Sequence, residues 1–267
     1  MPVIRIESID DPRLFIYTKS SESQLLHINE PNGEGIFIAE SEYIISLALA
    51  AGYEPVSALC EDALLSSDVI LSLRDIPIYT AELSVLKSIT GFNLTEGMLC
   101  AMKRKPLPSV QTLCEGAKRI AVLEHVMNPT NVGAIMRSAA ALGIDALLLS
   151  YDCADPLYRR ACRVGRGTAF CLPYGFFEKG KPHHNVGILK SLGFKVAAMA
   201  LEDDSISADD ERLKSCEKLA ILLGSEGDGL TKESIAECDM TVKIPMKRGV
   251  DSLNVAAASA VIFWSVC

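Results

Sequence analysis

A regular alternation of short apolar runs with segments of helical apolar spacing limits the fold of this chain more than any other feature. The alternation begins at Ile120 and continues to the C-terminus. The runs expected to form strands are Ile120–Glu124, Ala146–Ser150, Phe170–Pro173, Lys195–Ala200, Leu219–Leu223 and Thr241–Ile244. The segments expected to form helices are Val132–Leu142, Asp155–Val164, Val186–Leu192, Lys232–Glu237 and Leu253–Trp264. Strands that alternate with helices predict an α/β fold with a mainly parallel sheet covered on both faces.

The residues before this alternation predict a second, smaller α/β unit. Its expected strands are Gly35–Ala39, Pro55–Leu59, Asp68–Ser72, Pro77–Tyr79 and Gly97–Ala101, and its expected helices are Glu42–Ala51 and Ala81–Ile89. Between the two regions, Met102–Ser109 contains three consecutive basic residues and two prolines, which predicts a stiff, exposed connector. We therefore expect one domain of residues 1–105 and another of residues 106–267. For the basic triplet, plain solvation is favoured over a contact to phosphate.

The distribution of charge differs between these two regions. The chain has 26 Lys and Arg against 34 Asp and Glu, a net charge of -8, which argues against coating nucleic acid through bulk charge. Residues 1–105 hold 8 basic and 15 acidic residues, whereas residues 106–267 hold 18 and 19. The acidity therefore belongs to the first region, and a local basic patch in the second remains compatible with nucleic-acid binding.

Cysteine usage and hydropathy indicate a cytoplasmic protein. The nine cysteines form no C-x-x-C pair and do not cluster with His or acidic residues at metal-ligand spacing, so we expect free, mostly buried thiols and no metal. The N-terminus has early charges and no apolar core of a signal peptide. The longest apolar stretch, Leu253–Cys267, is too short to span a bilayer and predicts a core helix.

Three loops follow expected strands at the edge where ligands bind in parallel sheets. In the first, Asn128–Ala139, Asn131 suits an N-cap, and Arg137 is surrounded by small residues that leave room for a ligand. By itself this loop is more typical of a capped amphipathic helix with a surface arginine.

The second loop, Gly224–Leu230, contains three glycines that allow the backbone to wrap closely around a ligand. Glu226 and Asp228 would repel a phosphate, so a neutral or cationic ligand fits better; a simple tight turn is equally compatible with the pattern. The order is not G-x-G-x-x-G, and the chain has no P-loop motif, which excludes dinucleotide and P-loop readings.

The third loop, Pro245–Val255, places Ser252 where an N-cap is expected. Asn254 lies in the expected first turn of an otherwise apolar helix, where Asn is a poor helix former. A buried or half-buried Asn requires a hydrogen-bond partner, so we expect Asn254 to contact another loop or a ligand.

Taken together, the three loops resemble the SpoU (TrmH) family of S-adenosylmethionine-dependent RNA 2′-O-ribose methyltransferases, within the SPOUT class. The resemblance covers Ile120 to the C-terminus, in the family's motif order: N-P-T-N-V-G-A-I-M-R-S-A, L-G-S-E-G-D-G-L, and I-P-M followed by S-L-N-V-A-A-A. Thr130 stands where the family usually has Gly. Each motif alone is weak evidence, whereas three in order on strand-end loops are strong evidence.

This resemblance implies a C-terminal trefoil knot, against the general rule that chains are unknotted, and an active site formed across a homodimer. It assigns S-adenosylmethionine binding to Leu223, Gly224, Ile244, Met246 and Leu253, and the catalytic region to Asn131, Arg137, Glu226, Ser252 and Asn254. Because arginine keeps its proton up to pH ~12, orienting the ribose and stabilising its developing alkoxide is an easier role for Arg137 than general base. No metal is required.

The implied activity is methyl transfer to a ribose 2′-hydroxyl, most readily of large-subunit rRNA. The alternatives are tRNA as substrate, or a non-catalytic RNA-binding or ribosome-assembly factor on the same fold. Arg159, Arg160, Arg163 and Arg166 form a cluster that we expect to contact RNA phosphates. The first region has a weaker similarity to the ribosomal-protein-like substrate-binding domain that often precedes this catalytic domain.

Overall fold

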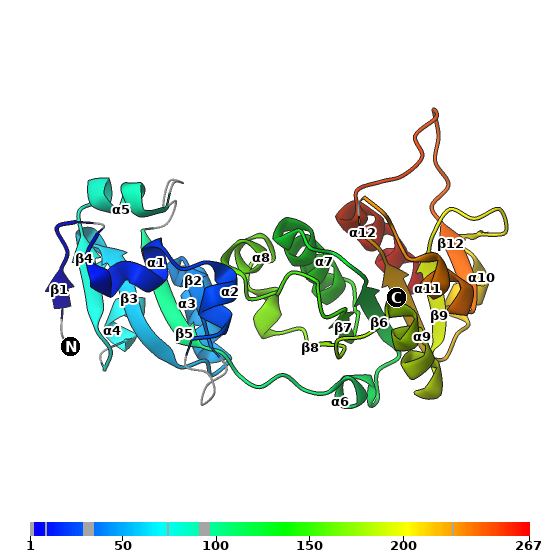
Figure 1. The fold of residues 1–267 in the computed structure, drawn as a ribbon, viewed down its shortest axis with the longest axis horizontal. Coiled ribbons are helices and arrows are strands. Elements are labelled where there is room, and N and C mark those ends of the chain that lie inside the picture. The colour runs from blue at the N-terminus through cyan, green and yellow to red at the C-terminus, as the bar shows by residue number, and fades with distance from the viewer. Residues whose placement is uncertain (1–2, 9, 29–34, 74, 91–96, 226) are drawn as a thin grey trace. The chain divides into compact units, whose positions relative to one another are not determined.

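A computed structural model describes residues 3–8, 10–28, 35–73, 75–90, 97–225 and 227–267 (Figure 1). The chain forms two compact units. The first comprises Met1–Pro106 together with Leu157–Arg163, and the second comprises Leu107–Pro156 together with Val164–Cys267. Each unit has its own sheet.

The second unit is built on a seven-stranded sheet in the order β10-β12-β9-β11-β6-β7-β8. Every strand pairs in parallel with its neighbours, which confirms the predicted parallel sheet. The strands are β6 (Arg119–Leu123), β7 (Ala146–Leu149), β8 (Tyr174–Phe176), β9 (Lys195–Met199), β10 (Ile206–Ser207), β11 (Leu219–Leu223) and β12 (Met240–Lys243).

Helices cover both faces of this sheet. The helices of this unit are α6 (Val110–Cys114), α7 (Pro129–Ala141), α9 (Pro182–Ser191), α10 (Glu211–Lys214), α11 (Lys232–Glu237) and α12 (Val255–Val266). Helix α8 (Arg159–Val164) belongs to the first unit except for its last residue. Alternate residues of β6, β7, β9 and β11 form one core with α6, α9 and α11. The strands are buried on their other face too, and there α7 packs against β7 and α12.

Two element predictions for residues 106–267 are wrong in detail. The run expected as a strand at Phe170–Pro173 begins within a 3₁₀ turn, Thr168–Phe170, and the strand follows at Tyr174–Phe176. Gly167, with φ of 76°, precedes this turn, and Leu172 N–H donates back to the Thr168 carbonyl at 2.9 Å, which keeps the backbone out of extended geometry. The helix expected from Asp155 begins only at Arg159.

The first unit has a mixed five-stranded sheet in the order β1-β4-β3-β5-β2. Its strands are β1 (Val3–Arg5), β2 (Ile36–Glu40), β3 (Pro55–Glu61), β4 (Ile78–Ala81) and β5 (Met98–Lys103). Its helices are α1 (Phe15–Thr18), α2 (Glu22–Leu26), α3 (Glu42–Ala50), α4 (Asp68–Ser72) and α5 (Leu83–Thr90), with 3₁₀ turns at Pro12–Leu14 and Asp62–Leu64. The strand predicted at Asp68–Ser72 is wrong, because the Ser67 side chain accepts from Ile70 N–H and caps a helix there.

The expected connector at Met102–Ser109 is also wrong at its start. Met102 is fully buried in β5, and Lys103 ends that strand with an ion pair to Glu54 at 2.7 Å. Arg104 Nε donates to the Ile36 carbonyl at 3.2 Å, and Lys105 Nζ donates to the Ala51 carbonyl at 2.6 Å. The basic triplet therefore stabilises the first unit through its own contacts.

Candidate active site

The loops after β9, β11 and β12 surround one cavity of about 460 Å³ in the second unit. Its wall includes every residue predicted to bind the cofactor: Leu223, Gly224, Ile244, Met246 and Leu253. Ser252, predicted for the catalytic region, lines it as well. Residues that lie far apart in the sequence thus meet where the carboxyl ends of adjacent parallel strands meet.

The glycine-rich loop Gly224–Leu230 folds back tightly on itself. Ser225 forms an isolated antiparallel bridge with Gly229, whose φ is 69°. A Cβ on Gly224 would lie 2.4 Å from the Gly229 carbonyl carbon and 2.5 Å from the Leu230 nitrogen, so a side chain has no room there. The shape of the loop therefore favours glycine at positions 224 and 229. Glu226, predicted to be catalytic, lies outside the described residues.

The cavity wall suits a ligand that combines an apolar body with positive charge. Its apolar part includes the side chains of Leu223, Ile244, Met246 and Leu253. Its charged residues are Glu202, Asp228, Asp251, Lys232 and Lys243. S-adenosylmethionine has a flat adenine and a cationic sulfonium, and its size is within the range that cavities of this volume enclose. The residues present therefore fit this cofactor.

Two asparagines join the starts of the two helices on this face. Asn131, 6% exposed, lies in the first turn of α7, and its Oδ1 accepts from Asn254 Nδ2 at 3.4 Å. Asn254 in turn caps α12, because its Oδ1 accepts from Ala256 N–H at 3.0 Å. The predicted contact of Asn254 with another loop is thus present.

The predicted cap positions are wrong at both helices. Asn128 caps α7 in place of Asn131, since its side chain accepts from Thr130 N–H at 2.9 Å and Pro129 takes the first helical position. Asn254 caps α12 in place of Ser252. Asn254 therefore lies just outside the apolar helix, which removes the conflict between this residue and helical structure.

Arg137 lies about two turns into α7 and is exposed. It is not part of the cavity wall formed by its own chain. Of the residues predicted for the catalytic region, Ser252 lines the cavity, whereas Asn131, Asn254 and Arg137 are not part of its wall.

The four arginines predicted to contact RNA fall into two groups. In the first unit, Arg159 Nε lies 2.8 Å from Glu40 Oε2, and Arg163 Nη1 lies 3.2 Å from both oxygens of that carboxylate. Glu40 is only 4% exposed, so these two arginines compensate a buried charge. Arg160 and Arg166 are exposed at the surface.

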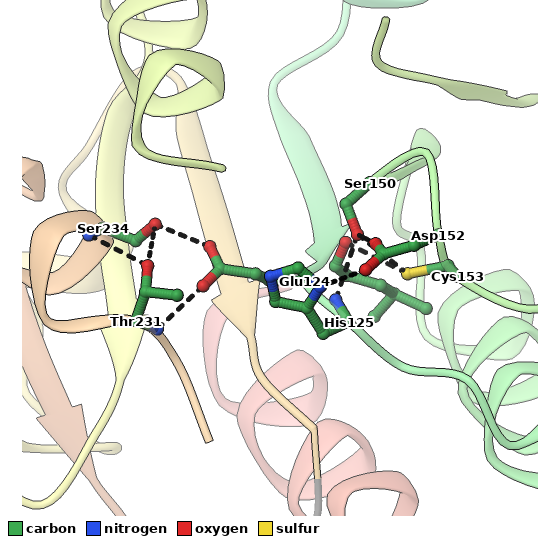
Figure 2. Close-up of polar contacts among 8 residues, drawn as sticks. Glu124, His125, Ser150, Asp152, Cys153, Thr231 and Ser234 are labelled. Carbon is green, nitrogen blue, oxygen red and sulfur yellow. Dashed lines mark hydrogen bonds and ion pairs between the residues drawn. The ribbon is translucent and has the colours of Figure 1, made fainter. Parts of the chain in front are cut away.

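Sequence reasoning missed two polar clusters at the ends of β6 and β7, which Figure 2 shows. On one side, buried Glu124 accepts from the Thr231 backbone and the Ser234 hydroxyl. On the other side, Asp152 accepts from the Ser150 hydroxyl at 2.6 Å and contacts His125 Nδ1. A carboxylate at the end of an apolar strand was the available signal for Glu124.

Burial and hydrogen bonding shift the pKa of groups in these clusters. Burial by itself raises the pKa of Asp152, but hydrogen bonds from Ser150 and His125 outweigh it and lower that pKa below its ordinary value. Burial, followed by the charge of Glu124, raises the pKa of the Cys238 thiol to about 12. All nine cysteines are free, and five of them are buried.

In the part of the chain that the structure describes, no group of three or more His, Cys, Asp or Glu side chains is placed to hold a metal ion. No helix there is both long and apolar enough to cross a membrane.

The second unit combines a parallel sheet with a cavity whose wall includes the glycine-rich loop. These features define an α/β protein that binds a small cofactor at the carboxyl ends of its strands. The model of the SpoU rRNA Methylase family matches residues 118–264, more than half of the chain. The chain therefore belongs to this family, and its class is that of the S-adenosylmethionine-dependent RNA methyltransferases.

Relatives and solved structures agree with this assignment. An uncharacterized tRNA/rRNA methyltransferase of Mycobacterium bovis is 37% identical over 262 residues, which cover 96% of this chain and 88% of the relative. The 23S rRNA (guanosine(2553)-2′-O)-methyltransferase RlmP of Bacillus subtilis is 25% identical over 85% of this chain and 87% of its own length. The crystal structure of an AdoMet-bound rRNA methyltransferase from Sinorhizobium meliloti has a TM-score of 0.81 at 21% identity, covering 99% of this chain and 97% of that one, and thus shares the fold.

Proposed function

We propose that this protein transfers a methyl group from S-adenosylmethionine to a ribose 2′-hydroxyl of large-subunit ribosomal RNA. The observation that carries the proposal is the convergence of Leu223, Gly224, Ile244, Met246 and Leu253 on one cavity. The similarity to a curated 23S rRNA 2′-O-methyltransferase over most of the chain supports ribosomal RNA as the substrate class.

S-adenosylmethionine, when bound, supplies an activated methyl group on a sulfonium. The task of the protein is then alignment, because the reacting oxygen must approach that methyl group in line. Gly224, Ile244 and Leu253 would hold the cofactor, largely through backbone groups. Asn131, Ser252 and Asn254 would hold Arg137 or the substrate in register.

Arg137 orients the ribose and a neighbouring phosphate and stabilises the oxygen anion as the hydroxyl loses its proton. Its guanidinium keeps its own proton up to pH ~12 and presents several donors in a rigid plane. Such a group lowers the barrier by stabilising charge that develops in the transition state.

We propose that the site is completed by a second copy of the chain. Two features support a homodimer: Arg137 lies outside its own cavity, and α12 has an exposed apolar stripe. Along that stripe Val261 and Trp264 are 41% and 78% exposed, and exposed Ala257 lies one turn before Val261, at helical spacing. A contiguous apolar surface of this kind is typical of a protein interface.

Three further predictions remain part of this proposal. The C-terminal segment that carries α12 is expected to be knotted, as the family resemblance implies. Residues 1–105 are expected to act as the ribosomal-protein-like RNA-binding domain of the 106–267 methyltransferase domain. Arg160 and Arg166, both exposed, are expected to contact RNA phosphates, in a cytoplasmic setting compatible with free thiols.

Mapping ribose methylation in total RNA from cells with and without the gene tests the proposal. We expect one or more 2′-O-methyl groups of large-subunit rRNA to disappear without the gene. A loss confined to tRNA would move the substrate to the alternative class, and an unchanged map would favour a non-catalytic role in RNA binding or ribosome assembly.

A further inference from the structure

Glu124 is a buried acid that lies next to the cofactor cavity without lining it. It follows β6 directly and is 2% exposed. In Figure 2 its side chain points away from His125 and toward Thr231 and Ser234, which lie at the start of α11. Both partners are neutral donors, so the position of this carboxylate depends on hydrogen bonds rather than on an ion pair with them.

The backbone of Glu124 fixes the start of the glycine-rich loop. Its N–H donates to the Leu223 carbonyl at 2.9 Å, directly before Gly224. This bond continues the parallel ladder of β6 and β11, in which Leu123 lies opposite Leu223. The loop therefore leaves the sheet directly beside the backbone of Glu124.

The side chain of Glu124 fixes the end of the same loop. Oε1 accepts from Thr231 N–H at 2.8 Å, and Oε2 accepts from the Ser234 hydroxyl at 2.7 Å. Thr231 also caps α11 by accepting from Ser234 N–H at 3.3 Å. One residue thus contacts the chain on both sides of Gly224–Leu230.

The spacing of the two loop ends matters because the backbone approaches itself closely where they meet. The backbone at Gly229 and Leu230 crosses Gly224 so closely that a single Cβ would overlap it. Ser225 and Gly229 are bridged, and the described loop residues form a wall of the cavity. A small displacement of Thr231 therefore changes the shape of that wall.

We infer that Glu124 is a positioning residue for S-adenosylmethionine, holding both ends of the Gly224–Leu230 loop in the spacing that the cofactor requires. The inference rests on the proposed function and deepens it. Glu124 acts through the loop and does not touch the cofactor.

Titration calorimetry with S-adenosylmethionine tests this role in the full-length chain and in Glu124→Leu and Glu124→Gln. Glu124→Leu leaves the buried Ser234 hydroxyl and the part-buried Thr231 N–H without this acceptor, so its Kd rises by about tenfold to a hundredfold. Glu124→Gln keeps an acceptor for Thr231 N–H, and its Kd rises by a smaller factor. In turnover assays the KM for S-adenosylmethionine rises by a larger factor than kcat falls.

Asp145→Ala is the matched control, because Asp145 accepts from the Lys118 and Arg119 N–H groups, both at 2.8 Å, at the opposite end of β6. The Kd of Asp145→Ala for S-adenosylmethionine stays unchanged, although this variant too loses two hydrogen bonds. Circular dichroism establishes that each variant is folded; if Glu124→Leu does not fold, the Kd of Glu124→Gln decides the question.

An unchanged Kd in the folded Glu124 variants overturns the inference, as does an equal rise in Asp145→Ala. If the unaltered protein does not bind S-adenosylmethionine, the proposed function itself fails. The two failures are therefore distinguishable in one series of titrations.

Discussion

The two units use their charged residues in different ways. In the first unit, the basic triplet Lys103–Lys105 and the arginines Arg159 and Arg163 make contacts with carbonyls and carboxylates of the unit itself. In the second unit, Arg137 is exposed and charged residues line the cofactor cavity. In this chain, a run of like charges in the sequence is therefore a weaker sign of a binding surface than the position of a charged residue just after a strand of a parallel sheet.

Arg137→Ala tests this difference with the largest expected effect. We expect methyl transfer to fall by about a hundredfold to a thousandfold, because a preorganised donor at the developing charge is removed. Cofactor binding should remain nearly intact, since Arg137 is not in the cavity wall. Turnover assays paired with calorimetry measure both quantities. Arg13→Ala, in the first unit, is the control; normal turnover in Arg137→Ala would falsify the role.

Trp264→Glu tests the apolar stripe of α12. A charge at this position, which is 78% exposed, should convert the dimer to a monomer and reduce transfer strongly, with little loss of the monomer's stability. Light scattering at micromolar concentration gives the oligomeric state. Phe15→Glu introduces the same charge at a half-exposed aromatic of the first unit and should leave the dimer unchanged. A protein that is monomeric before mutation contradicts the shared site.

Arg159→Ala sharpens the contrast between the two groups of arginines. Removing this partner of buried Glu40 should lower the free energy of unfolding by about 1–3 kcal/mol, with Arg163 retaining part of the compensation. Arg166→Ala should weaken RNA binding, whereas Arg159→Ala should leave RNA binding unchanged. Urea unfolding and filter binding separate these effects. An unchanged free energy of unfolding in Arg159→Ala, or equal RNA binding by the two variants, would contradict the assignment.

Asn254→Ala and Ser252→Ala compare two neighbours in the third loop. Loss of the Asn254 cap should cost about 1 kcal/mol of unfolding free energy, because Ala256 N–H loses its acceptor. Ser252 does not cap α12, so its replacement should change stability by only a few tenths of a kcal/mol. Thermal unfolding of both variants measures the difference, and the reverse order would place the cap at Ser252.

The smallest expected effect is the contribution of Asp152 to the loss of folding stability at acidic pH. Its folded-state pKa lies below the ordinary value of 3.8, so its stabilising contribution is complete above that pH and is lost as the pH falls through the lowered pKa. Asp152→Asn should therefore reduce stability at neutral pH and show a weaker loss below pH 3.8 than the unaltered protein. Urea unfolding across this range measures both, and parallel curves would contradict the assigned shift.

The fold of the second unit was predictable because its signals are local and repeated. Apolar runs such as Leu219–Leu223 and intervening helical patterns specify a parallel sheet, and such a sheet brings its strand-end loops together. The residues predicted to bind the cofactor lie in or beside those loops, and their roles were assigned through the family resemblance. By contrast, the short run at Asp68–Ser72 became a helix because a single cap, Ser67, overrode its apolar character.

The features that the sequence did not predict depend on contacts between residues far apart in the chain. Nothing in the segment Leu157–Arg163 indicates that it packs with the first unit, where Glu40 meets it. The role of Glu124 likewise depends on Thr231 and Ser234, which lie more than one hundred residues away. Partners at such separations are set by the tertiary structure and leave no periodic pattern.

The central claim is the chemical identity of the product, and methyl transfer from S-adenosylmethionine with a labelled methyl group tests it most directly. Purified protein is incubated with unmodified ribosomal RNA, and the RNA is then hydrolysed in alkali. A 2′-O-methyl group prevents cleavage at its own nucleotide, so the label is predicted in alkali-resistant dinucleotides and absent with Arg137→Ala. Label recovered in mononucleotides as a methylated base, or no label in RNA at all, would contradict the account.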